Sequence, residues 1–243
     1  MIYRLYQLFI ALPVGLVLTA LTAIVTFVGS IFNPHFWGYW PAHLWARAVC
    51  KLLLLPVCVE GRENIDATQS YVFVANHQGA LDIFLVYGYL NRNFKWMMKH
   101  ELRRIPLVGA ACQRAGHIFV DNRNAAAVRH TYEQARQTLQ GGTSVFVFPE
   151  GARTLTGRMT AFHKAAFQLA AELQLPVVPM TIDGPYVALP RQRGFWFVRR
   201  TALRLTIHAP LQPPASTATA DVRATTDAAR ATIARGLPCE VEP

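Results

Sequence analysis

The chain has 243 residues, 52% of them hydrophobic, and a formal net charge of +10 at pH 7. This length suits one domain with an appendage, and the apolar, basic composition suits contact with an anionic membrane surface or a phosphorylated substrate. We expect no nucleic-acid partner, because the sequence has no basic run interleaved with aromatic residues and no nucleic-acid-binding module.

The first predicted element is an apolar N-terminal helix. No charged residue occurs from Leu5 to Phe32, a length that can span a bilayer. Pro13 and Gly15 lie inside this run and permit a kink, so a re-entrant or tilted hairpin fits as well as a straight span. A buried hairpin in a soluble protein is the weaker alternative, because 28 uncharged residues would need a very large core to cover them.

Aromatic residues and a second apolar helix follow this run. The aromatic side chains suit the headgroup level of a membrane, and they are Trp37, Tyr39, Trp40 and Trp45. The second helix is predicted over about His43–Leu55. We therefore expect residues 1–58 to form membrane-anchoring helices. We expect no removable signal peptide, because no small-residue cleavage site is followed by a polar sequence.

From about Glu60 onward, strand-like runs alternate with helical patterns, which predicts an α/β fold with a largely parallel sheet flanked by helices. The predicted strands are Tyr71–Ala75, His117–Val120, Ser144–Phe148, Val177–Ile182 and Leu203–His208, and the predicted helices are Leu81–Leu90, Ala125–Leu139 and Ala161–Leu173. Asn124 is placed to cap the second of these helices and Gly141–Gly142 to end it. We assign residues 59–210 to a single catalytic domain. Residues 211–243, rich in Ala, Thr and Pro, are expected to start as a flexible tail and to end as a peripheral helix.

The four cysteines predict no metal site. They are Cys50, Cys58, Cys112 and Cys239. None forms a C-x-x-C pair, and no Cys/His cluster has the spacing of a zinc site. We interpret them as scattered apolar residues of a reducing compartment.

A histidine and an aspartate stand five residues apart in the stretch YVFVANHQGALDIF, as His77 and Asp82. An imidazole held by a carboxylate is a ready general base. Five residues correspond to about 500° around an α-helix, so the two side chains meet only if the chain turns between them, and Gly79 supplies freedom for such a turn. The alternatives are a core histidine at a strand end and an aspartate that caps the helix beginning near Ile83.

Two further strand ends carry polar residues, and functional groups of open α/β sheets collect at such ends. One is FVDNR, with Asp121 and Arg123, where Asp121 could equally be a turn former. The other is FPEGART, with Glu150, Gly151, Arg153 and Thr154. The guanidinium of Arg153 suits a phosphate, and the glycine beside it allows close approach of a ligand. An ordinary surface ion pair is the alternative role for this arginine.

In this order the three segments resemble the glycerolipid acyltransferase family, and within it most closely the bacterial 1-acyl-sn-glycerol-3-phosphate acyltransferases. The family's H-x-x-x-x-D motif corresponds to NHQGALD, its F-[VI]-D-R motif to FVDN followed by Arg123, and its F-P-E-G-[TA]-R-[ST] motif to FPEGART. Its apolar V-P motif corresponds to Val178-Pro179. The resemblance runs from about residue 70 to 185, and the combination of motifs is specific.

Two positions depart from the family pattern. Asn122 stands where the second motif usually has arginine, so Arg123 comes one residue late. Either Arg123 swings in, or this part of the phosphate pocket is weaker. Ala165 stands where glycine is common after the third motif, a change that bears on helix packing.

The resemblance implies roles for the site residues. His77 would remove the proton of a lysolipid hydroxyl as it attacks an acyl thioester, and Asp82 would orient the imidazole. No Ser or Cys stands in a nucleophile elbow, so direct transfer without a covalent intermediate is the simpler mechanism. Arg153 would bind the phosphate, and Glu150 would orient Arg153 or a glycerol hydroxyl. The further pocket candidates are Gly151, Thr154, Lys99, Arg123 and Asp121.

The function implied by the resemblance is acylation of the sn-2 hydroxyl of 1-acyl-sn-glycerol-3-phosphate (lysophosphatidic acid), which gives phosphatidic acid. The donor would be acyl-ACP or acyl-CoA, and no cofactor is needed. The enzyme would sit at the cytoplasmic face of a bacterial inner membrane. Two alternatives are an acyltransferase acting on another lysolipid, such as lyso-ornithine lipid, and a non-catalytic lipid-binding membrane protein.

Overall fold

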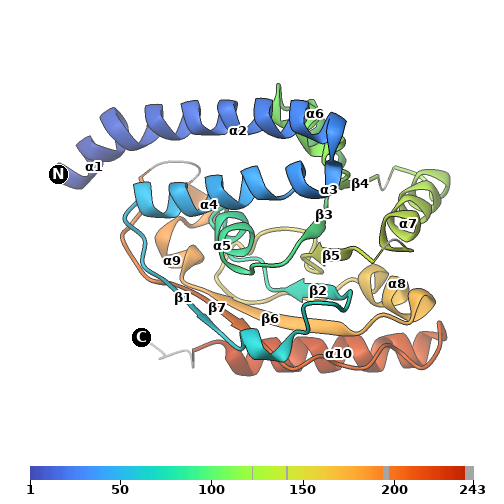
Figure 1. Ribbon diagram of the computed structural model, residues 1–243. Helices are drawn as coiled ribbons and strands as arrows, with labels where there is room; N and C mark the ends of the chain where they lie inside the picture. Colours follow the sequence, from blue (N-terminus) through green and yellow to red (C-terminus); the bar gives the residue numbers. More distant parts are fainter. Residues whose placement is uncertain (122, 141, 194–196, 239–243) are drawn as a thin grey trace. The chain divides into compact units, whose positions relative to one another are not determined.

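The computed structural model describes residues 1–121, 123–140, 142–193 and 197–238. They form two compact units. Unit 1 comprises Met1–Leu55 with Ile83–Phe146, and unit 2 comprises Pro56–Asp82 with the chain from Val147 onward. Each unit combines helices with mainly parallel strands (Figure 1), so the predicted α/β class is confirmed.

Three parallel strands form the sheet of unit 1. Strand β3 (Phe94–Lys99) lies between β5 (Ser144–Val147) and β4 (Ile118–Val120). The sequence did not predict β3, because two lysines interrupt its apolar run. The structure buries one of them, Lys95, whose Nζ donates to the Ala115 carbonyl over 2.7 Å.

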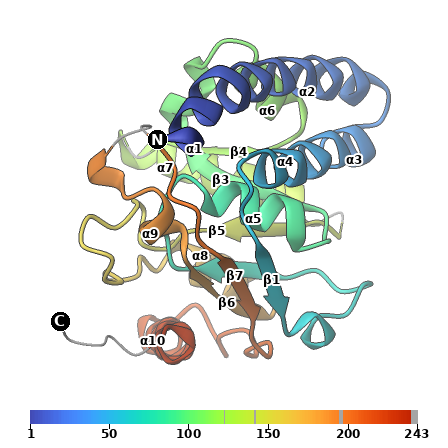
Figure 2. The ribbon, with the colours of Figure 1, turned by 90° about the vertical axis from the view of Figure 1, so that its left-hand side faces the viewer.

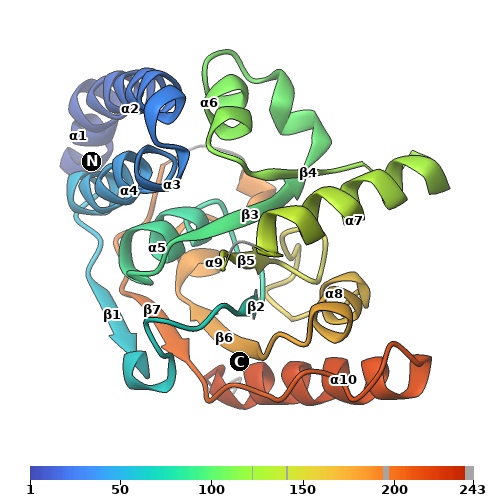
Figure 3. The same ribbon diagram turned by 45° about the vertical axis from the view of Figure 1, so that its right-hand side comes forward.

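Helices surround these strands. Beside β4 runs α7 (Ala125–Gln140), as Figure 3 shows. Asn124 caps α7 as predicted, because its Oδ1 accepts from the Ala127 amide over 2.8 Å. Unit 1 also contains, between Asp82 and Arg114, α5 (Asp82–Tyr89), the 3₁₀ turn η3 (His100–Arg104) and α6 (Val108–Arg114). The predicted stop at Gly141 and the unusual Asn122 lie outside the described residues.

The N-terminal run is one continuous helix of 31 residues, Ile2–Phe32. It consists of α1 (Ile2–Tyr6), a π-helical turn (Gln7–Ala11) and α2 (Leu12–Phe32). The π-helical turn ends at Ala11, two residues before Pro13. Because proline has no N–H, it disrupts regular α-helical hydrogen bonding. The wider π-helical turn accommodates this local change, and the helix continues. Only 11% of the most apolar part of this helix is buried, which disagrees with the buried-hairpin alternative.

The chain then returns alongside this helix through α3 (Pro34–Trp37) and α4 (Trp40–Leu52). Figure 1 shows α2 and α4 side by side. The Tyr3 hydroxyl donates to the Leu53 carbonyl over 2.6 Å, and the Trp45 indole donates to the Thr19 hydroxyl over 3.0 Å. The two helices therefore form a hairpin with specific polar contacts.

The aromatic cluster divides between surface and core. Trp37 and Trp40 are exposed, as an aromatic belt requires. Tyr39 does not fit that interpretation, because it is buried and its ring packs against His43, Tyr87 and Phe94. A tyrosine can be buried when its hydroxyl finds a polar neighbour, which here is the His43 Nδ1 atom at 3.4 Å.

Four strands form the sheet of unit 2, in the order β1 (Val57–Glu60), β7 (Leu203–Ile207), β6 (Val177–Asp183) and β2 (Val72–Ala75). The pairs β1–β7 and β2–β6 are parallel, and β6–β7 is antiparallel. Every residue of β2 is buried, as are the first six of β6. The apolar composition of β2, and of β6 up to Met180, reflects burial on both faces.

Three helices and two 3₁₀ turns complete unit 2. They are α8 (Ala165–Leu173), α9 (Pro185–Ala188), α10 (Thr219–Gly236) and the turns at Arg62–Asn64 and Arg191–Arg193. The predicted C-terminal helix is present as α10, which packs along β6 (Figure 2). Gly236 makes this contact possible, because a Cβ atom there would lie 2.4 Å from the Thr181 hydroxyl. Helix α8 begins at Ala165, four residues later than predicted, because the preceding residues belong to a loop.

A buried histidine belongs to the core of unit 1. The Trp96 amide donates to Nδ1 of His117 over 3.2 Å, and the Tyr87 hydroxyl lies 2.7 Å from Nε2. Burial, with a smaller contribution from the positive charge of Lys95, lowers the pKa of His117 to about 3. The folded protein therefore keeps this imidazole neutral.

We predict that His117 makes the protein acid-sensitive. In the unfolded chain an ordinary histidine takes up a proton below about pH 6.5, whereas folded His117 does so only near its pKa of about 3. Its contribution to stability is present above pH 6.5 and is lost as the pH falls toward 3. The free energy of unfolding of the original protein should fall between pH 7.5 and pH 5, and that of His117→Gln should fall less. An equal fall in both proteins would contradict this prediction. His130→Gln, at an exposed site on α7, is the control for replacing a histidine by glutamine.

Candidate active site

The predicted histidine–aspartate pair is formed in unit 2. His77 lies two residues after the end of β2, and its Nδ1 lies 2.6 Å from Oδ2 of Asp82. Asp82 is fully buried, and His77 has 16% of its side chain exposed. Because a carboxylate only accepts hydrogen bonds, Nδ1 carries the proton in this contact. In the neutral ring Nε2 then keeps its lone pair and can accept a proton.

A turn between the two residues brings them together. The Gly79 amide donates to the same Asp82 oxygen over 3.0 Å, and the Asp82 amide donates to the Gly79 carbonyl over 3.4 Å. The expected reason for the glycine was wrong, because its backbone does not adopt a left-handed conformation. The glycine is needed for space: a Cβ atom would lie 3.2 Å from the Pro185 carbonyl oxygen and 3.3 Å from that of Leu189.

The FPEGART segment fixes the backbone of His77 from both sides. Oε1 of Glu150 accepts from the His77 amide over 2.8 Å, and the Thr154 amide donates to the His77 carbonyl over 2.8 Å. The imidazole also stacks on the ring of Phe148, with centroids 3.9 Å apart and the planes 9° from parallel. These contacts restrict both the position and the tilt of the imidazole.

Glu150 is a buried connector. Its second oxygen, Oε2, accepts from the amide and from the hydroxyl of Thr160, each over 2.7 Å. The carboxylate therefore joins the backbone of His77 to the loop that precedes α8. This arrangement favours a positioning role toward His77 over the expected role toward Arg153 or a glycerol hydroxyl.

The other three residues of this motif shape the loop. Gly151 has φ +70°, and a Cβ atom there would lie 3.2 Å from the ring of His163. The Thr154 hydroxyl is buried, donates to the Arg158 carbonyl over 2.8 Å and accepts from two amides. Arg153 is partly buried, and its carbonyl accepts from Arg191 over 3.0 Å. Unit 2 thus brings together six of the predicted site residues.

The remaining three predicted site residues lie in unit 1. Arg123 binds both carboxylate oxygens of Asp121, with Nη2 to Oδ2 at 2.5 Å and Nε to Oδ1 at 2.9 Å. These bonds hold the pKa of Asp121 well below its usual range and raise the pKa of Arg123. Lys99 is exposed at the end of β3, in register with Val120 of β4.

Sequence reasoning missed several residues that support His77. Phe148 and Thr160 contact the site as described, and His163 lies over Gly151. Asn76 pins the end of β2 to β6, because its side chain both accepts from the amide of Ile182 and donates to its carbonyl. The position of Asn76 at a strand end was a usable signal, whereas Thr160 and His163 carried none because their partners are distant in sequence.

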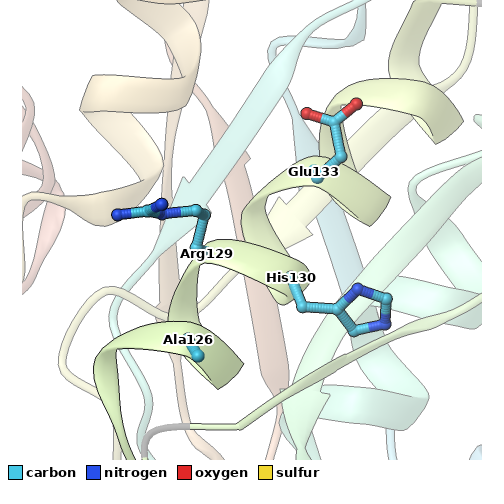
Figure 4. A pocket seen from close by; sticks show the side chains of 4 residues that line it. All are labelled: Ala126, Arg129, His130 and Glu133. Atoms are coloured by element: carbon cyan, nitrogen blue, oxygen red, sulfur yellow. The ribbon is translucent and has the colours of Figure 1, made fainter.

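A hollow of about 490 Å³ on unit 1 does not form a second site. It is lined by Ala126, Arg129, His130 and Glu133, and Figure 4 shows all four on the single helix α7. One helix face cannot enclose a ligand. Among the described residues there is also no group of three or more His, Cys, Asp or Glu side chains placed to bind a metal.

A family model described as Acyltransferase matches residues 56–183, more than half of the chain. The chain belongs to the acyltransferase family. This match includes the end of β2, the FPEGART segment and β6, and therefore Asp82, Phe148, Glu150 and Thr154, which contact His77.

Similar proteins are known in algae, plants and bacteria. The chain is 33% identical over 200 residues to a 1-acyl-sn-glycerol-3-phosphate acyltransferase of Chlamydomonas reinhardtii, covering 82% of this chain and 58% of the relative. It is 30% identical over 185 residues to a chloroplastic protein of the same name from Arabidopsis thaliana, covering 74% and 51%. The chain thus spans between half and three fifths of the length of these relatives.

A solved structure has a similar fold over nearly the whole chain. It is the 1-acyl-sn-glycerophosphate (LPA) acyltransferase PlsC of Thermotoga maritima, with a TM-score of 0.78 and 27% identity over 97% of this chain and 93% of that chain. The match extends beyond residues 56–183 and includes the N-terminal helices.

We predict that Glu150→Gln destabilises the acyltransferase and displaces His77. The amide would place an NH₂ group against one of three donors and would remove the charge from all three hydrogen bonds, at a cost of about 2 kcal/mol. Thr160→Val is a milder control, because it removes one hydroxyl and keeps the bond to the His77 amide. Unfolding free energies should rank Glu150→Gln below Thr160→Val below the original protein. Equal values for Glu150→Gln and the original would refute the connector role.

Proposed function

We propose that the protein transfers an acyl chain from acyl-ACP or acyl-CoA to the sn-2 hydroxyl of 1-acyl-sn-glycerol-3-phosphate, giving phosphatidic acid. The observation that carries this proposal is the 2.6 Å contact between His77 Nδ1 and Asp82 Oδ2, clamped by the FPEGART segment. The names of the similar proteins support the choice of acceptor.

In the proposed reaction Nε2 of His77 accepts the proton of the acceptor hydroxyl as its oxygen attacks the thioester carbonyl. Asp82 stabilises the resulting imidazolium and does not take the proton itself. The C–S bond then breaks, and the thiolate leaves and takes the proton from His77. The new ester and the free thiol account for all atoms, and the histidine returns to its starting state without a covalent intermediate.

Arg153 is the proposed phosphate ligand. It follows Gly151, whose lack of a side chain lets a ligand approach the backbone, and a guanidinium can bind two phosphate oxygens at once. Arg123 is a weaker candidate, because Asp121 already binds its guanidinium. Thr154 belongs to the same segment as Arg153, and Lys99 and Asp121 stay proposed substrate-binding residues of unit 1. The proposed reaction needs no cofactor or metal.

We propose that residues 1–58 anchor the protein to a membrane, that residues 59–210 form the catalytic domain and that residues 211–243 are peripheral to it. The apolar helix Ile2–Phe32 is long enough to cross a bilayer and is mostly exposed. The proposed location is the cytoplasmic face of a bacterial inner membrane, where the acceptor and the product both reside in the bilayer.

We predict that His77→Ala and Asp82→Asn each lose acyl transfer, by about 10²–10⁴-fold. The first change removes the base, and the second leaves the imidazole without its charged partner. Membranes containing each variant should be assayed with labelled acyl donor and lysophosphatidic acid, and protein amounts should be matched by immunoblotting. Full activity of His77→Ala would contradict the mechanism, and a non-catalytic lipid-binding protein would show no activity in any variant.

We predict that Arg153→Gln raises the KM for lysophosphatidic acid about 10- to 100-fold through loss of charge-assisted bonds. Arg123→Gln should change it far less, because this arginine is engaged by Asp121. The two variants form a matched pair, since each replaces one arginine near a predicted strand end. A larger rise in KM for Arg123→Gln than for Arg153→Gln would show that Arg123 is the main phosphate ligand.

The Asp121–Arg123 pair supports a second candidate for the acceptor substrate. An arginine neutralised by a carboxylate contributes less to phosphate binding, which favours a phosphate-free acceptor such as lyso-ornithine lipid. Offering the two lysolipids separately to the same membranes decides between them. Activity on lyso-ornithine lipid alone would overturn the choice of lysophosphatidic acid.

A further inference from the structure

We propose that the segment from His100 to Leu107 is a second membrane-contacting element of unit 1, separate from the N-terminal helices, and that its ligand is a bilayer surface with anionic headgroups. This inference rests on the membrane association proposed above. It adds a specific contact surface that the apolar N-terminal run does not provide.

The segment presents apolar side chains to solvent. Leu102, Ile105 and Leu107 are 40%, 43% and 55% exposed, within six residues of one another. Single exposed apolar residues are common, but a close group of three, each at least two fifths exposed, is characteristic of an interaction surface. The segment therefore has the composition of a contact site.

Backbone geometry shows that this exposure is not the result of a loose loop. The Ile105 amide donates to the Leu102 carbonyl over 3.2 Å, and the Gly109 amide donates to the Ile105 carbonyl over 2.8 Å. A Cβ atom at Gly109 would lie 2.1 Å from the Arg103 carbonyl oxygen, so the chain folds back tightly on itself. The apolar side chains are thus held outward by a well-bonded turn.

Leu107 adopts a strained backbone conformation. Its φ of +61° and ψ of −54°, with the Val108 amide donating to the Pro106 carbonyl over 2.7 Å, define a γ-turn of the rare, strained kind. A bulky residue with positive φ is an outlier that persists where the surroundings or the function require it. Here the leucine side chain is more than half exposed, so protein packing does not account for its retention.

The charge and the position of the segment indicate that its partner is an anionic bilayer surface. Arg103 and Arg104 are exposed beside the three apolar side chains, and arginines next to inserted apolar groups suit anionic lipid headgroups. Leu107 directly precedes α6, which packs against α2, and the Arg114 guanidinium lies 5.5 Å from the Phe27 ring. Figures 1 and 2 show α6 beside α2. The segment therefore adjoins the exposed apolar helix that is long enough to cross a bilayer.

The test uses a fluorescent probe attached to one introduced cysteine at a time in the full chain, and the native Cys50, which is fully buried, is retained. Ile105→Cys and Val128→Cys are made in a Cys58→Ser, Cys112→Ser, Cys239→Ser background. Val128 is a matched control, because it is also apolar, lies in unit 1 and is 45% exposed on α7. Each protein is mixed with vesicles of phosphatidylcholine and phosphatidylglycerol that carry a lipid-attached quencher. We expect several-fold stronger quenching at position 105 than at position 128, and weaker quenching at 105 when Arg103→Gln and Arg104→Gln are added.

Flotation of the same vesicles distinguishes two questions: whether the protein associates with the membrane, and whether this segment contacts it. If the protein does not float with the vesicles, the membrane association itself fails. If it floats but positions 105 and 128 are quenched equally, the segment is not a membrane contact. Self-association through this segment would instead give concentration-dependent cross-linking at position 105 without quenching, which would also overturn the inference.

Leu107→Gly, added to the protein labelled at position 105, supplies a second measurement that changes the turn without moving the label. Glycine tolerates positive φ, so the variant should unfold at an equal or higher temperature in detergent. It should nevertheless reduce the quenching at position 105, because the inserted side chain is gone. Lower thermal stability together with unchanged quenching would show that the leucine serves packing and not membrane contact.

Discussion

The hydrogen bond between the His77 imidazole and the Asp82 carboxylate is the interaction on which the proposed chemistry depends. It decides which nitrogen carries the proton and therefore which nitrogen is available to a substrate. A fully buried carboxylate is costly unless it is hydrogen-bonded. Oδ2 of Asp82 is bonded to the His77 ring and the Gly79 amide, whereas its buried Oδ1 has no hydrogen-bond partner among the described residues. The burial of the aspartate thus fixes the imidazole and its tautomer together.

The FPEGART segment extends this constraint from a side chain to the backbone. Through Glu150 and the Thr154 amide it binds the amide and the carbonyl of His77, while Phe148 supports the face of the ring. The glutamate of the motif is therefore best understood as structural support for the histidine. The arginine of the same segment is the proposed phosphate ligand, so one short loop would serve both tasks.

The proposed membrane association involves more than an anchor. The N-terminal helical hairpin exposes a long apolar surface, and the turn before α6 displays apolar side chains on a strained backbone. A long helix fixes a protein to the bilayer but leaves its rotation open. A second, short contact beside basic residues would restrict that rotation, because both elements belong to unit 1.

The sequence by itself determined the α/β class, most of the strands and helices, and the pairing of His77 with Asp82. These features follow from local patterns: apolar runs, capping residues such as Asn124, and a motif whose spacing requires a turn. Local patterns failed where burial overrides composition, as in β3, whose Lys95 is buried against a carbonyl, and at Tyr39, which belongs to the core.

Only the tertiary structure decided the roles that depend on contacts between distant residues. Glu150 meets Thr160 and His77, Asn76 meets Ile182, and Gly79 packs on the carbonyls of Pro185 and Leu189. No periodicity encodes such partners, because they are brought together by the sheet and by the loops that leave it. The strain at Leu107 is likewise invisible in sequence, since a leucine carries no sign that its backbone will be left-handed.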